Sequence, residues 1–185
     1  MSVLGLATGG VKVRSDYYFK HELVHILAVL MPENRLACEV SLATGLRIGD
    51  VLRLRTIQLK NRFSVIEEKT GKRKSIYLND SLLNRLLSIA GKIYVFEGRT
   101  DCRKHRTRQA VYKDIRRVRD LMRLKVNLSP HTMRKTYAVE MYHKYKTSKK
   151  VMELLNHSSE AVTMLYLLSE AQTEKLLNAG KRAKK

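Results

Sequence analysis

The chain has 185 residues, of which 37 are Lys or Arg and 17 are Asp or Glu, so its formal net charge is +20. A hydrophobic fraction of 44% with 29% charged residues is typical of a globular protein and excludes wholesale disorder. No apolar run approaches the ~20 residues that cross a bilayer, the first residues lack the features of an export signal, and two cysteines make no disulfide framework. We therefore expect a cytoplasmic protein with no membrane partner.

The N-terminal half begins with an arm and continues as helices. Residues 1–16 have no clear period and are predicted to form an arm or leader. Apolar residues at helical spacing predict a helix over 17–30, with Leu23 and Leu27 on one side. Further helices are predicted over 34–43 and from about 47 to 53.

Two short segments rich in β-branched and aromatic residues follow, at 62–68 and 74–78. The sequence Lys-Thr-Gly-Lys that begins at Lys69 joins them, which predicts a β-hairpin with a glycine turn. Helices are predicted after it over 81–90, 131–144, 147–155, 159–167 and 170–178, besides a basic helix. The expected fold class is mainly α with a small antiparallel β-sheet (α+β).

Positive charge is concentrated in residues 103–125, which hold ten Lys or Arg and two acids. Val111, Ile115, Val118 and Met122 form one apolar stripe at helical spacing. The basic side chains on the other faces are Arg108, Lys113, Arg116, Arg117, Arg119 and Arg123. A solvated helix or a membrane-surface helix would also show this pattern, but the large excess of charge favours a nucleic acid as partner. The basic tail, 179–185, is weaker evidence.

Metal chemistry finds little support in the sequence. The segment 21–25 reads His-Glu-Leu-Val-His, the zinc-binding H-E-x-x-H pattern, but no third ligand follows at the expected spacing. The adjacent acids Glu67 and Glu68 would face opposite sides of a strand, and no Walker loop is present. We therefore expect no metal and no cofactor, and any phosphate chemistry would depend on Arg, His, Lys and Tyr.

Two arginines stand where helices can present them to a phosphate. His131 and Arg134 are spaced i, i+3, which places an imidazole and a guanidinium on one helix face. Arg47 lies at a predicted helix N-terminus, which attracts anions, and Asp50 could orient its guanidinium from one turn away. Each feature alone is also compatible with a capping His or a surface Arg.

His157 and Tyr166 are nine residues apart and would point to opposite sides of an unbroken helix. Ser158 and Ser159, followed by an acid, are typical of a helix start, so His157 is assigned to the preceding loop. Tyr166 alone would be read as an ordinary half-buried aromatic residue.

Taken together these residues resemble the catalytic domain of the tyrosine recombinases, the family of phage integrases and Xer-type recombinases. The segment 43–51, Ala-Thr-Gly-Leu-Arg-Ile-Gly-Asp-Val, is similar to the first box of that family. Lys69 matches its β-turn lysine, and 131–138, His-Thr-Met-Arg-Lys-Thr-Tyr-Ala, resembles its second box. Leu-Leu-Asn-His-Ser-Ser at 154–159, followed by Tyr166, resembles the family's Leu-Gly-His-Ser-Ser segment and its nucleophile.

The resemblance implies a site-specific recombinase or integrase that cuts and rejoins double-stranded DNA through a 3′-phosphotyrosyl intermediate, without metal or ATP. It implies that Tyr166 is the nucleophile and Asp50 a supporting residue. The other catalytic residues would be Arg47, Lys69, His131, Arg134 and His157. A non-catalytic DNA-binding regulator and a type IB topoisomerase are the alternatives that share this fold or chemistry.

The resemblance also sets the expected organisation. Residues 17–178 would form the catalytic domain, the N-terminal core-binding domain of the family is expected to be absent, and DNA affinity should then be reduced. The segment after Tyr166 often docks on a neighbouring subunit in the family, so we expect a monomer in solution and a tetramer on paired DNA sites. Asn156 replaces the usual glycine before His157.

Overall fold

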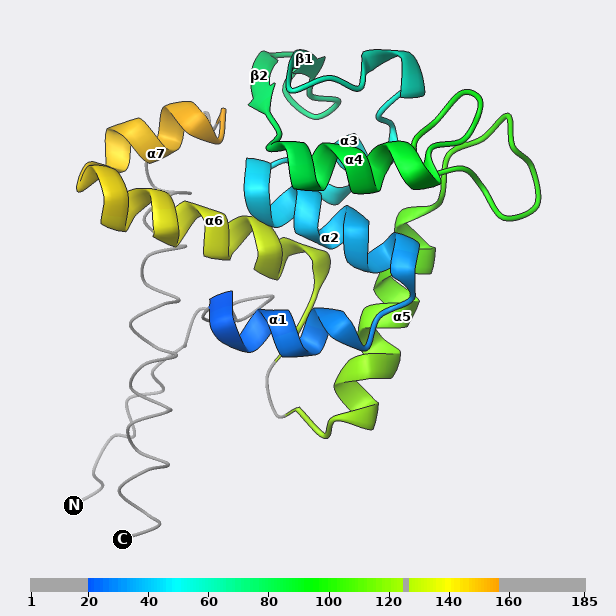
Figure 1. Ribbon diagram of the computed structural model, residues 1–185. Coiled ribbons are helices and arrows are strands. Elements are labelled where there is room, and N and C mark those ends of the chain that lie inside the picture. Colours follow the sequence, from blue (N-terminus) through cyan, green and yellow to red (C-terminus); the bar gives the residue numbers. More distant parts are fainter. Residues whose placement is uncertain (1–19, 125–126, 157–185) are drawn as a thin grey trace, which may run out of the picture.

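The computed structural model describes residues 20–124 and 127–156, and these form a mainly helical domain with one hairpin (Figure 1). Its elements, in chain order, are α1 Lys20–Ala28, α2 Pro32–Thr44, α3 Ile48–Leu52, the 3-10 helix η1 Thr56–Gln58, β1 Arg62–Ile66, β2 Arg73–Tyr77, α4 Asp80–Ile89, α5 Arg108–Leu121, α6 Pro130–Tyr145 and α7 Ser148–Leu154. The expected α+β fold class is confirmed, whereas the arm, the basic tail and the helices predicted over 159–167 and 170–178 lie outside the described residues.

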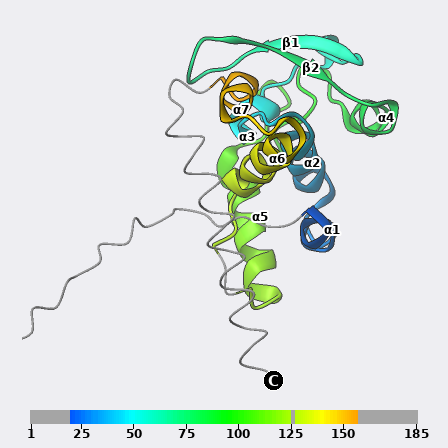
Figure 2. The same cartoon turned by 90° about the vertical axis from the view of Figure 1, so that its left-hand side faces the viewer.

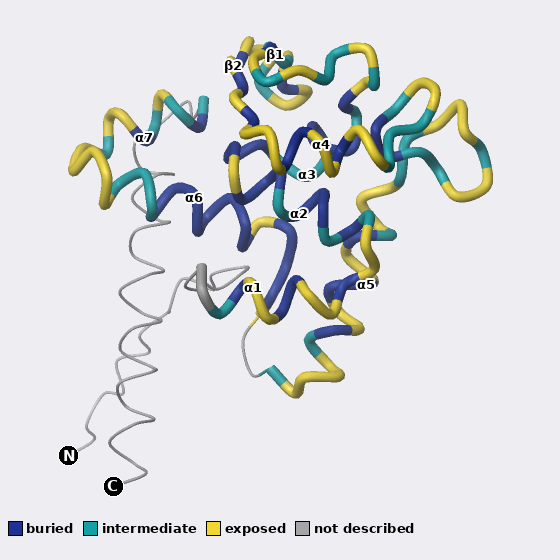
Figure 3. The backbone as a smooth tube through the Cα atoms, in the orientation of Figure 1, coloured by how far each residue is buried: buried dark blue, intermediate teal, exposed yellow. Residues whose placement is uncertain are grey.

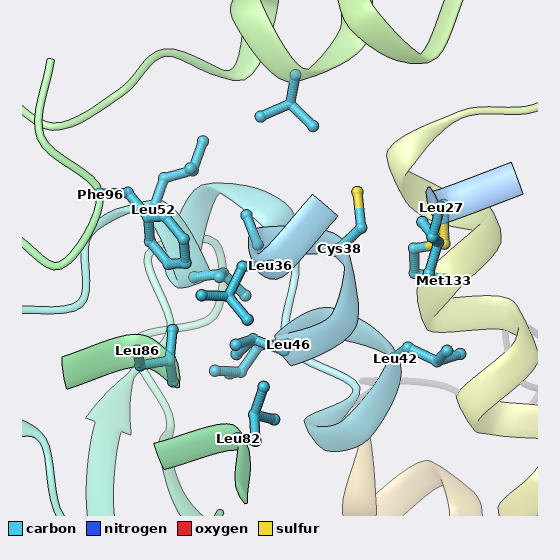
Figure 4. Packing of buried hydrophobic residues seen from close by; sticks show 14 of the residues in the cluster. Leu27, Leu36, Cys38, Leu42, Leu46, Leu52, Leu82, Leu86, Phe96 and Met133 are labelled. Atoms are coloured by element: carbon cyan, nitrogen blue, oxygen red, sulfur yellow. The ribbon is translucent and has the colours of Figure 1, made fainter. Parts of the chain in front are cut away.

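Helix α2 is the centre of the domain and packs against α1, α3, α4, α5 and α6. Its apolar residues join those of its neighbours in a continuous core; Figure 4 shows Leu36 and Cys38 of α2 between Met133 of α6 and Leu86 of α4. In Figure 3 both α2 and the first half of α6 are mostly buried. Burial of this apolar surface is the main stabilising contribution to the fold.

The end of α2 is fixed by Gly45, which adopts a left-handed conformation with φ 68° and donates its N–H to the carbonyl of Ser41. A Cβ at this position would lie 2.4 Å from the Tyr137 ring of α6. Glycine is therefore required here both by the backbone angle and by the close approach of the two helices. This junction places Arg47, two residues later, beside α6.

Capping side chains begin three of the helices, α4, α5 and α6. The side chain of Asn79 accepts a hydrogen bond from the N–H of Leu82 at the start of α4. Ser129 caps α6 and forms a reciprocal pair with Thr132, with Pro130 in the first turn. The Thr107 side chain accepts a hydrogen bond from the Ala110 N–H at the start of α5. The caps at Asn79 and Ser129 account for the agreement between the predicted and observed starts of α4 and α6.

The hairpin pairs β1 and β2 in antiparallel register, with Ser64 opposite Ser75. Its turn contains Gly71 at φ 64°, the conformation for which a glycine was expected. Phe63 and Ile76 point into the core, as does Lys74, while the alternate residues of β2 are exposed. In Figure 2 the hairpin lies over α2 and α6, which are seen nearly end-on.

Helix α5 carries the predicted apolar stripe over three of its four positions. Val111, Ile115 and Val118 are fully buried, but the prediction for Met122 is wrong, since it is 38% exposed. The helix ends at Leu121, so Met122 no longer follows the helical period.

A buried polar network joins α5 to the start of α2. The Asp114 carboxylate accepts hydrogen bonds from the Met31 N–H and the Asn34 amide, both at 2.8 Å, and pairs with Arg117 at 2.8 Å. Burial raises the pKa of Asp114, but these donors outweigh it and hold the pKa below its usual value.

No helix within the described residues is long and apolar enough to cross a membrane.

Candidate active site

A pocket of about 490 Å³ opens between α3, the hairpin turn and the start of α6. Four of the residues predicted to be catalytic line it together: Arg47, Lys69, His131 and Arg134. They come from three segments that are far apart in the sequence. The remaining lining residues are Ile48, Gly49, Asp50, Glu68, Arg108 and Pro130. The lining therefore has four cationic side chains against two acids.

Arg47 enters the pocket from the residue that precedes α3. Its backbone is extended, with φ −65° and ψ 144°, so it lies at the helix cap rather than within the helix. The side chain is 20% exposed, and Nη1 lies 3.2 Å from Oε1 of Glu67. Arg47 is thus held on one side while part of its guanidinium remains accessible.

Arg134 lies in the second turn of α6 and is only 1% exposed. Its Nη1 donates to the carbonyl of Gly45 at 2.6 Å and to Glu67 Oε1 at 3.3 Å, and its Nη2 donates to the carbonyl of Leu155 at 2.6 Å. A buried cation requires such partners, because an unpaired one would be strongly destabilising. The guanidinium is thereby fixed in the wall of the pocket.

Glu67 is a residue of the site to which the sequence interpretation gave no role, and Lys74 is another. It follows β1 directly, is fully buried, and presents the same Oε1 atom to Arg47 and Arg134. Burial raises the pKa of Glu67, but the charge of Arg134, the Asn156 side chain and the charges of Arg47 and Lys74 outweigh it and lower the pKa. The carboxylate therefore stays ionised.

A buried lysine completes the charge cluster. Lys74 of β2 is 8% exposed, and its Nζ has no hydrogen-bond partner among the described residues. The ammonium group lies 5.5 Å from the centre of the Tyr137 ring. Burial, assisted by the positive charge of Arg134 and Arg47, lowers the pKa of Lys74 to about 7.

The other two predicted groups lie at the mouth of the pocket. Lys69 is exposed in the hairpin turn, and His131 is exposed in the first turn of α6. Surrounding protein atoms partly exclude water from the His131 ring, and Arg134, Arg47, Lys135 and Lys69 add positive charge, so its pKa is lowered. The His131 imidazole is therefore neutral at neutral pH and can accept a proton.

Asp50 does not make the expected contact with Arg47. Its Oδ1 accepts from the Glu68 N–H at 3.0 Å and from Arg53 Nη2 at 3.3 Å. Arg47 is the cap residue of α3 and has extended backbone angles, so the i, i+3 geometry of a helix does not apply to this pair. Asp50 instead supports the hairpin segment that carries Glu67 and Lys69.

A basic groove continues from the pocket along α5. Arg108, Lys113 and Arg116 line this second hollow of about 430 Å³, together with Tyr112 and His131. The three other predicted DNA contacts do not line it. Arg117 pairs with Asp114, Arg119 pairs with Asp120 at 2.7 Å, and Arg123 lies past the end of the helix. The half of the helix near the pocket thus presents its positive charge to the groove.

The two remaining predicted catalytic residues, His157 and Tyr166, lie outside the described residues. The described chain stops at Asn156, whose neighbour Leu155 holds Arg134 through its carbonyl. Within residues 20–124 and 127–156, no group of three His, Cys, Asp or Glu side chains is arranged to hold a metal ion.

Comparison with known proteins is consistent with this arrangement. Residues 19–173 match the model of the phage integrase family. The chain is 30% identical over 130 residues to a probable integrase/recombinase, YoeC, of Bacillus subtilis, covering 67% of this chain and 71% of that protein. It is 26% identical over 163 residues to a tyrosine recombinase of Thermosipho africanus, covering 82% of this chain and 56% of that protein.

Solved structures show the same fold. A lambda integrase fragment bound as a dimer to a COC′ core site superposes with a TM-score of 0.68 at 23% identity, covering 84% of this chain and 60% of that one. The XerH recombinase bound to palindromic difH in a post-cleavage complex gives 0.66 at 21% identity, covering 81% and 48%. The family match extends over most of the sequence and includes every box described above. This chain belongs to the phage integrase family of tyrosine recombinases.

Proposed function

We propose that the chain cuts and rejoins double-stranded DNA at a specific site, using Tyr166 as the nucleophile. The observation that carries the proposal is the pocket in which Arg47, Lys69, His131 and Arg134 converge beside a basic groove. The cations that line the pocket, Arg47, Lys69, Arg108 and Arg134, outnumber its two acids, Asp50 and Glu68, and such an excess of positive charge suits a phosphodiester. The chain spans between about half and three quarters of the length of the relatives it matches, so the proposal concerns the reaction of this domain.

In the proposed step the Tyr166 hydroxyl attacks the scissile phosphorus. A P–O bond forms to tyrosine, the bond to the 5′-oxygen breaks, and the 3′ end remains attached to the protein as a phosphotyrosyl ester. The phenol proton goes to a base, and the leaving 5′-oxygen takes a proton from an acid. Reversal with a different 5′-hydroxyl rejoins the strand, and because the ester conserves the bond energy the reaction requires neither ATP nor metal.

The two arginines would stabilise the charge that builds on the nonbridging oxygens. Arg47 is partly exposed and can contact the phosphate directly, whereas Arg134 contributes its charge from the pocket wall. Fixed positive charge in a site shielded from water stabilises a transition state without reorganisation. Removing one such group costs on the order of 3–4 kcal/mol in the barrier.

Proton transfer would use the groups at the pocket mouth. His131 would accept the Tyr166 proton; its lowered pKa keeps the ring in the neutral form that an acceptor requires, although it also makes the ring a weaker base. Lys69, exposed on the turn, would protonate the leaving oxygen. His157 would donate a hydrogen bond to the phosphate, as the resemblance implies.

The DNA would lie across the pocket and along the basic half of α5. Arg108 lines both hollows, so a backbone seated in the pocket would continue past Lys113 and Arg116. Lambda integrase and XerH were crystallised on their DNA sites, and lambda integrase also as a tetramer bound to a Holliday junction. These likenesses support a duplex as partner. We propose with it that a monomer in solution assembles into a tetramer on paired sites, as lambda integrase does on a Holliday junction.

Covalent capture from a randomised pool tests the proposal whatever the target sequence is. The purified chain is incubated with nicked duplexes whose central segment is randomised, and adducts are isolated under denaturing conditions and sequenced. We expect wild type to capture strands through one enriched sequence. Tyr166→Phe should bind the enriched duplex with unchanged affinity and form no adduct, because only the nucleophilic oxygen is removed.

The outcomes separate the alternatives. Capture of many unrelated sequences would indicate a topoisomerase, and sequence-selective binding with no adduct would indicate a regulator. An adduct formed by Tyr166→Phe would show that another residue is the nucleophile.

A further inference from the structure

We propose that Glu67 is a positioning residue of the cleavage reaction, which sets two arginines and the lysine-bearing turn in their mutual geometry; the inference rests on the function proposed above. One carboxylate would thus hold together the parts of the site that are to contact the phosphate and the leaving oxygen. The resemblance of this sequence to the family motifs assigned no role to Glu67.

Both oxygens of Glu67 are used, and on different parts of the site. Oε1 lies 3.2 Å from Arg47 Nη1 and 3.3 Å from Arg134 Nη1. Oε2 accepts a hydrogen bond from the Thr70 hydroxyl at 3.2 Å, one residue after Lys69. The Glu67 backbone also closes the turn, since its N–H donates to the Lys72 carbonyl and its own carbonyl accepts from the Gly71 N–H.

The geometry fixes the spacing of the two guanidinium groups. The same oxygen atom accepts a hydrogen bond from Arg134 and forms an ion pair with Arg47, so a shift of Glu67 changes the surroundings of both cations. Through Thr70 the same carboxylate restrains the turn that presents Lys69 to the pocket. A displacement of about 1 Å in a catalytic arrangement can lower a rate about 100-fold, so a fixed common partner matters for the reaction.

A structural role alone would have a different signature. Glu39 on α2 is also a carboxylate between two arginines, with Arg35 at 2.8 Å and Arg85 at 2.6 Å, but none of these three lines the pocket. Neutralising Glu39 removes a doubly paired acid from the fold without touching the site. It is therefore the matched control for Glu67.

The test measures single-turnover cleavage of the captured duplex at saturating protein, together with noncovalent DNA affinity and thermal unfolding. Glu67→Gln should lower the cleavage rate about 10- to 100-fold while the DNA dissociation constant changes less than about threefold. Glu67→Asp, which keeps the charge but is one methylene shorter, should give an intermediate rate. Glu39→Gln should cleave like wild type, since its effect is confined to thermal unfolding.

Coupling to Arg47 separates positioning from general stability. In an Arg47→Ala background the further loss caused by Glu67→Gln should shrink several-fold, because one of its two targets is gone. A Glu67→Gln rate equal to that of Glu39→Gln, or a full loss that persists without Arg47, would overturn the inference.

A milder variant keeps the inference falsifiable if Glu67→Gln fails to fold. Thr70→Val retains the shape of the side chain and removes the hydroxyl, which donates to Glu67 and also accepts a long hydrogen bond of 3.4 Å from the Lys72 N–H. We expect it to lower the cleavage rate several-fold with no change in DNA affinity; an unchanged rate would contradict the inference. A wild-type chain that captures no strand would overturn the proposed function, and the inference with it, whereas wild-type capture with unaffected variants would overturn the inference alone.

Discussion

Asp114 and Glu67 are both buried carboxylates that lie against arginine side chains, yet their surroundings differ. Asp114 meets two neutral donors and one arginine, so each of its oxygens is bonded and its charge is balanced by Arg117. Glu67 is one anion facing two arginines. The buried amine of Lys74, whose pKa is about 7 and whose Nζ has no hydrogen-bond partner in the described part of the chain, adds further positive charge when it is protonated. The first region is close to neutral and the second carries excess positive charge.

The difference indicates that the Asp114 network stabilises the fold, whereas the Glu67 cluster is suited to binding an anion. A fully bonded buried network stabilises a fold, because breaking it would leave unsatisfied groups. A cluster in which cations outnumber acids is costly for the protein alone and becomes favourable when an anion binds. The excess charge around Glu67 therefore matches the proposed phosphate site beside it.

The largest expected effect on stability is at Asp114. Asp114→Ala leaves the Met31 N–H and the Asn34 amide without their acceptor, so the free energy of unfolding should fall by about 2–4 kcal/mol. Because the Asp114 pKa is lowered on folding, this loss should be complete above pH about 4 and shrink as the pH falls through the folded-state pKa. Urea unfolding at several pH values measures it.

Cleavage at saturating DNA should be unaffected in Asp114→Ala below its unfolding transition. A specific loss of cleavage in the folded variant would contradict the division between the two regions.

Lys74→Met should raise the free energy of unfolding, whereas Asp114→Ala lowers it. The Lys74 pKa is about 7 in the fold and near 10.5 in the unfolded chain, so the unfolded state binds more protons between these two pH values. The free energy of unfolding of wild type therefore rises with pH from about 7 to about 10.5 and is lowest below pH 7, where the amine is charged in both states. Below pH 7 wild type buries the charged form, and there Lys74→Met should be more stable by about 1–3 kcal/mol. Above pH 10.5 the gain should be smallest.

Chemical denaturation of wild type and Lys74→Met at pH 6 and at higher pH, with Lys72→Met as a control on the exposed side of the hairpin, measures this difference. If the free energy of unfolding of wild type and of Lys74→Met changed with pH in parallel, the buried Lys74 ammonium would not be the source of the stability difference.

The smallest effect is expected at Asn156, the last described residue, which has φ 50°. Glycine adopts this conformation freely, whereas alanine pays a steric cost, so Asn156→Ala should be less stable than Asn156→Gly by about 1 kcal/mol. Both variants lose the amide beside Glu67, and the difference between them therefore reports the backbone alone. Equal melting temperatures for the two variants would argue against a left-handed residue at this turn.

Much of the fold could be predicted because local signals agreed with the global arrangement. Asn79 and Ser129 mark helix starts through hydrogen bonds that depend only on near neighbours, and Gly71 marks the hairpin turn. Met122 was misplaced because a periodic pattern does not state where a helix stops. The site residues Arg47, Lys69, His131 and Arg134 were found from the boxes that carry the family resemblance, since their convergence is a property of the tertiary structure.

The role of Glu67 was missed although the sequence contains a signal for it. Alternation along β1 places Phe63, Val65 and Glu67 on one face, and Phe63 and Glu67 are buried. An acid on an inward face must find a cation, but the sequence does not say that the partners come from α6 and from the residue before α3. The same limit applies to Asp50, whose expected contact with Arg47 presumed a longer helix than the structure has.

The anchoring of Arg134 has a consequence for how the domain tolerates sequence change. Two of its three described acceptors are main-chain oxygens, those of Gly45 and Leu155. Every amino acid brings a carbonyl, so no point mutation can delete either acceptor, and only a shift of the chain can. Substitutions can therefore remove the Glu67 carboxylate that pairs with Arg134, whereas the two main-chain acceptors remain as long as the backbone keeps its path.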